Sequence, residues 1–296
     1  MSTMFDTYTD LTILGGPVRL YRAGDTGPPV LLLHGAMLDT AQGVWHEIVP
    51  QLAPDHRVYA IDMPRHGGSR PWTGKLGDAF YSRFLLELLD HLGWERTVLM
   101  GLSMGAGVAH RFALAHPHRV SALVAIEPGG VESRYPFQLP IWAAQRIPGF
   151  MRLCTWLLAR TPGYLRSSME GSLTDGADTP GFERIIALAM EEARAKDRHG
   201  EKALDDWQID WFGPFEMRFH SIPELHRLTA PTLWVAGGLS RSIDKEAIAA
   251  AHAATPDSRM LTIADAGHIV AYDRPAQLGA AMREFLAEVL VSDDTP

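Results

Sequence analysis

Short apolar runs alternate with longer stretches whose apolar residues recur every three or four positions over the first 130 residues. Val30–Leu33 (VLLL) has no polar residue, which is typical of a strand covered on both faces of a sheet, and the longer stretches are typical of amphipathic helices. The pattern predicts helices over 44–52, 78–92 and 104–115, and strands over 11–14, 17–22, 30–33, 57–61, 97–100 and 120–126. Alternating strands and helices predict an α/β fold with a mostly parallel sheet flanked by helices.

The alternation stops near Pro128 and resumes at Pro231, after which strands are expected over 232–236 and 259–263 and helices over 245–254 and 275–289. Between these points the pattern predicts only helices, around 139–160, 182–196 and 204–211, interrupted by Pro-Gly pairs. We therefore predict a core formed by residues 1–130 and 227–296, with residues 131–226 forming a helical cap inserted between two strands.

The charge balance bears on possible partners. The chain carries 27 basic and 35 acidic side chains, a net charge of −8, which argues against nucleic acid or an anionic membrane as a partner. Its single cysteine, Cys154, cannot form an intramolecular disulfide. The first residues lack the apolar segment of a secretory signal, and no apolar run approaches the length of a membrane-spanning helix. A cytoplasmic location is the expectation from these features.

A candidate nucleophile lies in the pentapeptide Gly101-Leu-Ser103-Met-Gly105. It follows the strand TVLM and precedes a predicted helix, which is the setting in which the G-x-S-x-G pattern holds a reactive serine. The turn is so tight that glycine is favoured on both sides of the serine. The helix N-terminus that follows favours the negative charge that develops during nucleophilic attack.

A general base and two oxyanion donors can be assigned by the same reasoning. His268 follows the last predicted strand and precedes the final helix, where the histidine of such a site is expected. The backbone N–H of Met104, directly after the nucleophile, is the first expected oxyanion donor. The second is the N–H of Ala36, in the loop His34-Gly35-Ala36 that follows the strand VLLL.

These motifs resemble the capped α/β-hydrolase superfamily. The resemblance rests on His34-Gly35, on the segment Asp62–Ser69 (DMPRHGGS), on GLSMG and on the late Gly267-His268. It covers both flanks of the insertion and implies a serine nucleophile, unlike the aspartate nucleophile of epoxide hydrolases and haloalkane dehalogenases. It does not identify the substrate.

The resemblance leaves two candidates for the acid that orients the histidine. The superfamily usually has aspartate in a G-x-x-D pattern after the strand TLWVA, but here Ser240 occupies that position and the next acid is Asp244. Some relatives have the acid at the end of the strand after the nucleophile helix, where this chain has Glu127. These relatives include lactonases that open the mycotoxin zearalenone. We favour Glu127 over Asp244, which gives the triad Ser103, Glu127 and His268.

The expected reaction is hydrolysis of a small carboxylic ester or lactone through an acyl-enzyme, with no cofactor or metal. The aromatic-rich cap suits an apolar or ring-bearing substrate, and Met37, Trp207 and Trp211 are candidate substrate contacts. One alternative is cleavage of a carbon–carbon bond in a vinylogous diketone, although such relatives usually keep aspartate at the position of Ser240. The other is a ligand receptor built on the hydrolase fold.

Overall fold

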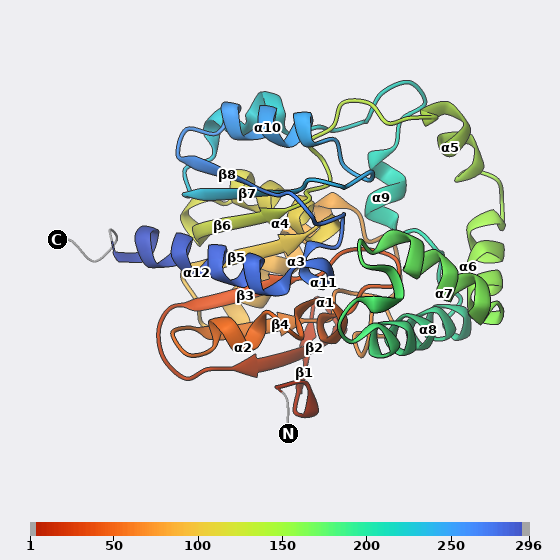
Figure 1. The fold of residues 1–296 in the computed structure, drawn as a ribbon, viewed down its shortest axis with the longest axis horizontal. Helices are drawn as coiled ribbons and strands as arrows, with labels where there is room; N and C mark the ends of the chain where they lie inside the picture. Colours follow the sequence, from red (N-terminus) through yellow and green to blue (C-terminus); the bar gives the residue numbers. More distant parts are fainter. Residues whose placement is uncertain (1–3, 292–296) are drawn as a thin grey trace.

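An eight-stranded sheet forms the centre of the computed structural model, which describes residues 4–291 (Figure 1). Its strand order is β1-β2-β4-β3-β5-β6-β7-β8. The pairs β1–β2 and β2–β4 are antiparallel and the other neighbours are parallel. The strands are β1 Thr9–Ile13, β2 Gly16–Ala23, β3 Pro29–Leu33, β4 Arg57–Ile61, β5 Thr97–Leu102, β6 Val120–Ile126, β7 Thr232–Gly237 and β8 Ser258–Ile263. The prediction of a mostly parallel α/β sheet is confirmed.

Helices cover both faces of this sheet (Figure 1). One buried cluster joins the sheet to α3 (Asp78–His91), α4 (Met104–Ala115) and α10 (Lys245–Ala254). A second cluster, on the opposite face, includes residues of α1 Ala41–Trp45, α2 Val49–Leu52, α11 Val270–Asp273 and α12 Pro275–Val291, together with residues of the insertion. The sheet is thus packed against a hydrophobic core on each of its faces.

The prediction of a single helix over 44–52 is wrong, because α1 and α2 are separate short helices. Pro50 lies in the first turn of α2. A proline has no backbone N–H and its ring clashes with the preceding turn, so it begins a helix far more readily than it continues one.

The residues between β6 and β7 form a helical insertion that Figure 1 places together at one side of the sheet. Its helices are α5 Gln138–Ala144, α6 Phe150–Arg160, α7 Pro162–Ser172, α8 Phe182–Arg198 and α9 Asp206–Trp211. The single helix expected around 139–160 is divided at Pro148-Gly149, where Gly149 adopts a φ of 79°. The sequence pattern does not predict helix α7, because Gly163 and Gly171 lower its helix propensity. Within the described residues, no helix is long and apolar enough to cross a membrane.

Candidate active site

Ser103 lies in the tight turn between β5 and α4. Its backbone adopts φ 54° and ψ −113°, a conformation that is strained for a residue with a side chain and is concentrated at functional sites. The flanking glycines are required by close packing: a Cβ on Gly101 would lie 2.4 Å from the backbone nitrogen of Ala106, and one on Gly105 would lie 2.3 Å from the Leu33 carbonyl oxygen. The local sequence therefore places the serine at the start of α4.

His268 pairs with a buried glutamate. Its Nδ1 lies 3.0 Å from Oε2 of Glu127, which is fully buried at the end of β6. Because a carboxylate only accepts, Nδ1 is the protonated nitrogen of the neutral ring and Nε2 is left as a hydrogen-bond acceptor. This is the tautomer that a general base needs in order to take a proton from a hydroxyl.

Two further donors hold the Glu127 carboxylate. Gly237 N donates to Oε1 over 2.7 Å, and the Ser240 hydroxyl donates to Oε2 over 2.5 Å. In the sequence Ser240 is noticed only as the absence of the usual aspartate. In the structure its hydroxyl donates to Glu127, the residue bonded to His268. The serine at the usual acid position and the glutamate at the earlier strand are therefore hydrogen-bonded to each other.

Asp244 has a different environment. Its Oδ1 accepts from Glu246 N over 3.0 Å and thereby caps α10, and its own N–H donates to Glu132 Oε1 over 2.9 Å. Among the residues that the structure describes, the carboxylate bonded to His268 is that of Glu127. The alternative acid is thus occupied in capping a helix.

The loop after β3 is held in one conformation by His34. Its Nε2 accepts from Met63 N over 2.9 Å and its Nδ1 lies 2.7 Å from the Gly35 carbonyl oxygen, so Nδ1 carries the proton. Burial lowers the pKa of this histidine well below its ordinary value, which keeps the ring neutral. Ala36, the expected oxyanion donor, lies two residues after His34 in this loop.

The predicted site residues other than Glu127 line one cavity of about 450 Å³. Its wall contains Ser103 and His268 together with Ala36, Met37, Met104, Trp207 and Trp211. Met104 is the first residue of α4, so its N–H has no acceptor within the helix. Glu127 lies behind His268 and outside the cavity wall. The two tryptophans also belong to the buried core, and Trp207 Nε1 donates to Asp78 over 3.3 Å.

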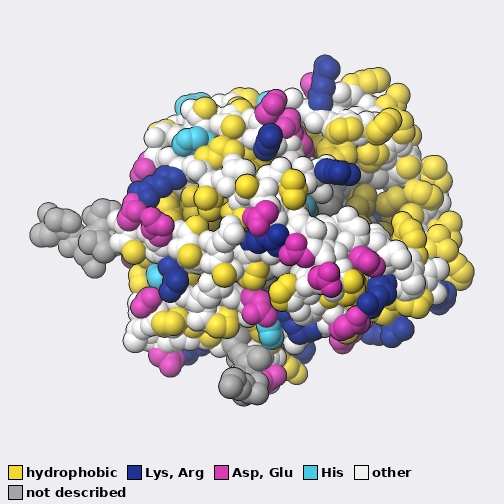
Figure 2. Space-filling model, viewed as in Figure 1, with side chains coloured by type: hydrophobic (Ala, Val, Ile, Leu, Met, Phe, Trp, Pro, Cys, Tyr) yellow, Lys and Arg dark blue, Asp and Glu magenta, His cyan; other side chains and the backbone are white. Residues whose placement is uncertain are grey.

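The opposite wall of the cavity comes from the helical insertion and is mainly apolar. It includes Ile141 of α5, Leu158 of α6 and Leu165 and Met169 of α7, with Phe212 after α9. Figure 2 shows hydrophobic side chains gathered over this part of the molecule, around a hollow in its surface. The loops at the ends of the sheet strands therefore supply Ser103 and His268, and the insertion supplies most of the apolar surface together with a few polar side chains such as Ser168.

Asp39, which is not among the predicted site residues, also lines the cavity. A Cβ on Gly35 would lie 2.3 Å from its Oδ2 and 3.4 Å from Ser103 Cβ, so the carboxyl group is close to the nucleophile. Burial raises the pKa of Asp39 to about 6, and the nearby His268 and His66 oppose that shift when their rings are protonated. Asp39 is three residues after Ala36, and this closeness in sequence to the expected oxyanion loop is the signal that could have identified it. The signal is weak because an aspartate in a loop is usually solvated.

Asp39→Asn is expected to raise the melting temperature more at pH 8 than at pH 4. The raised pKa means that ionised Asp39 is less stable in the folded protein than in the unfolded chain, so wild type loses stability as pH rises from 3.8 to about 6. A shift of this size corresponds to about 3 kcal/mol at most. Scanning calorimetry of both proteins at the two pH values measures the difference. An equal effect at pH 4 and pH 8 would contradict the raised pKa.

Comparison with known proteins adds an independent line of evidence. Residues 28–275 match the sequence profile described as the alpha/beta hydrolase fold. A pimeloyl-[acyl-carrier protein] methyl ester esterase of Aeromonas hydrophila is 27% identical over 275 residues, covering 88% of this chain and 96% of that enzyme. A 2-hydroxy-6-oxononadienedioate/2-hydroxy-6-oxononatrienedioate hydrolase of Pseudomonas putida is 26% identical over 271 residues, covering 89% of each chain. A solved structure of a thermophilic esterase from Thermogutta terrifontis aligns with a TM-score of 0.76 at 24% identity, covering 96% of this chain and 99% of that one.

Proposed function

Because this chain belongs to the α/β-hydrolase fold family, we propose that it is a serine hydrolase that cleaves carboxylic esters, including lactones. The observation that carries the proposal is the pairing of His268 with buried Glu127 at a cavity that Ser103 also lines. A nucleophile, a base and a group that orients the base are the three parts that acyl transfer by serine requires.

In the proposed mechanism, His268 Nε2 takes the proton of Ser103 as its oxygen attacks the ester carbonyl carbon. Glu127 stabilises the resulting imidazolium and keeps the ring in place. The backbone N–H groups of Ala36 and Met104 stabilise the oxyanion. His268 then protonates the departing alkoxide. In the second step it takes a proton from the water that attacks the acyl-enzyme, and it returns that proton to the Ser103 oxygen as the acid is released.

The apolar wall supports a substrate that is apolar or ring-bearing. Tyr135, Trp211 and Phe212 provide aromatic surface in the cavity that Ser103 lines, and Ile141 and Leu158 extend the apolar surface along α5 and α6. We propose that residues 131–226 act as a cap that excludes water from the acyl-enzyme and contacts the substrate. Met37 and Trp207, which line the same cavity, complete the proposed substrate contacts.

A substrate panel tests the reaction class. It contains p-nitrophenyl butyrate, an aryl acetate, a small lactone, a macrocyclic lactone and a ring-fission dienoate, each assayed with wild type and with Ser103→Ala. The proposal predicts the highest kcat/KM among the esters and lactones, with loss of turnover in the variant. Preference for the dienoate would instead identify a carbon–carbon hydrolase, and binding without turnover of any compound would identify a receptor.

A further inference from the structure

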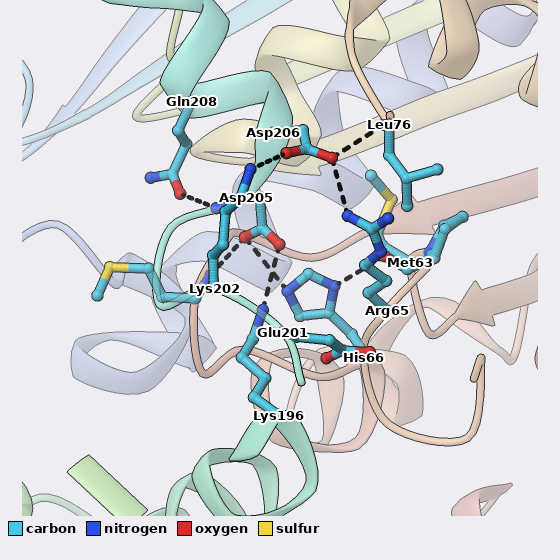
Figure 3. A network of polar contacts seen from close by, with 12 residues as sticks. Met63, Arg65, His66, Leu76, Lys196, Glu201, Lys202, Asp205, Asp206 and Gln208 are labelled. Atoms are coloured by element: carbon cyan, nitrogen blue, oxygen red, sulfur yellow. Dashed lines mark hydrogen bonds and ion pairs between the residues drawn. The ribbon is translucent and has the colours of Figure 1, made fainter. Parts of the chain in front are cut away.

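A buried ionic network joins the helical insertion to the core beside the proposed active site (Figure 3). At its centre is Asp205, the residue before α9, whose Oδ1 accepts from Lys196 Nζ of α8 over 3.2 Å. Lys196 is 1% exposed and Asp205 is 8% exposed. His66, which is fully buried, places Nε2 at 3.5 Å from the other carboxylate oxygen, Oδ2.

The same oxygen of Asp205 reaches the loop that carries the proposed oxyanion donor. Met37 N donates to Asp205 Oδ2 over 2.9 Å, although the two residues are 168 positions apart in the sequence. Met37 directly follows Ala36, and its φ of 63° is strained for a residue with a side chain. A conformation of this kind persists only when neighbouring groups hold it in place.

The loop is held from its other end by the core. His34 bonds to Met63 N and to the Gly35 carbonyl, and its ring packs edge-on against His66 with the ring centroids 4.9 Å apart. The peptide of Ala36 is therefore fixed between a histidine of the core and an aspartate of the insertion. Burial alone would raise the pKa of Asp205, but Lys196 and His66 together lower it by more, so the net shift is downward and the group is an ionised acceptor at neutral pH.

We propose that Asp205 is a positioning residue for the oxyanion hole, acting through Met37 N–H to keep the preceding Ala36 N–H directed at the reacting carbonyl. This rests on the proposed function, because it assumes that Ala36 stabilises an oxyanion. The insertion then completes the catalytic geometry as well as enclosing the substrate, and the Lys196 ammonium holds Asp205 in place.

Asp206, the next residue, provides a matched control. It also joins the insertion to the core: its Oδ2 accepts from Arg65 over 2.8 Å and from Leu76 N over 3.1 Å, and its Oδ1 accepts from Lys202 over 2.9 Å. None of these partners belongs to the loop 34–37. A residue that only attaches the insertion should therefore behave like Asp206, whereas a positioning residue should not.

The test compares two double variants, Asp205→Ala/Lys196→Met and Asp205→Asn/Lys196→Met. Methionine replaces the Lys196 stem with an unbranched apolar side chain, so neither variant leaves an unpaired buried charge. Only the asparagine variant keeps a hydrogen-bond acceptor at position 205, both for Met37 N–H and for the backbone N–H of Gln208 in the first turn of α9, which the Asp205 side chain caps. Asp206→Asn is measured beside them, and melting temperatures report how each substitution affects folding.

The alanine double variant should show a kcat about 10- to 100-fold below that of the asparagine double variant, with KM changed less than about threefold, because small displacements of a donor are costly in the transition state. The rate at which a fluorophosphonate modifies Ser103 should fall in parallel, and Asp206→Asn should retain wild-type kcat. Equal kcat and equal modification rates in the two double variants would overturn the role of Asp205. Ester turnover by Ser103→Ala would overturn the proposed function instead, so the two failures are distinguishable.

Discussion

Ser103→Ala is expected to lower kcat for ester hydrolysis by about 10⁶-fold, the order of the loss found when the nucleophile of a serine protease triad is removed. The substitution deletes one oxygen atom and leaves the backbone of the turn in place. Its φ of 54° is unfavourable for alanine as well as for serine, so little change in folding is expected. Initial rates with p-nitrophenyl butyrate, measured with enzyme purified free of host esterases, give the ratio.

Ser168 of α7, a second serine that lines the cavity, provides the matched control for this prediction. Ser168→Ala removes a hydroxyl from the opposite wall and should keep kcat within about threefold of wild type, since it lies outside the group of residues that act as a unit. Loss of activity in Ser168→Ala but not in Ser103→Ala would contradict the assignment.

Glu127→Gln should lower kcat by about 10³- to 10⁴-fold, with a smaller effect on KM, because the neutral amide no longer stabilises the imidazolium of His268 or fixes its tautomer. Glutamine keeps the volume of glutamate at this fully buried position. It has one acceptor oxygen where Gly237 N, Ser240 Oγ and His268 Nδ1 all approach the carboxylate. The pH dependence of kcat should therefore change together with its magnitude.

Asp244→Asn is the control for this prediction. An asparagine can cap α10 as aspartate does, so both stability and kcat should stay close to wild type. Steady-state kinetics of the two variants over pH 5 to about 9 decide between the two acids. A large loss in Asp244→Asn together with near-normal activity in Glu127→Gln would assign the acid to the later loop.

The central strands could be predicted from the sequence because they are buried on both faces of the sheet. Runs such as Val30–Leu33 and Val120–Ile126 contain almost no polar residues, and that signal does not depend on distant contacts. The helices of the insertion were harder to delimit. Gly163 and Gly171 have low helix propensity, yet α7 forms because Leu165 packs against α8 through Ala189, Met190 and Ala193. Tertiary packing of this kind is absent from a local pattern.

Within the site, the residues that could be predicted from the sequence are those that lie just after the end of a strand. Ser103, Glu127 and His268 each follow a predicted strand, so the topology of a parallel sheet brings them to one edge. The structure adds partners that come from elsewhere in the chain. The bond from Ser240 to Glu127 depends on the path of a loop, and the bond from Met37 to Asp205 depends on how the insertion packs. Neither can be deduced from spacing.

Asp39 illustrates the same limit for electrostatics. Its raised pKa follows from burial in a cavity whose walls come from the loop after β3, from α7 and from the loop before α11. The burial of Asp39 by these distant segments cannot be deduced from the sequence around it. The identity of the reactive groups is therefore encoded locally in this protein, whereas their protonation and their support depend on long-range packing.

Modification by a fluorophosphonate probe, located by peptide mass spectrometry, tests most directly whether Ser103 is an activated nucleophile. The expected result is one phosphonyl group per chain, attached to Ser103, with modification slowed about 10³-fold or more in His268→Ala because the general base is lost. Absence of modification, or modification of a different serine while Ser103 stays free, would contradict the assignment of this protein as a serine hydrolase.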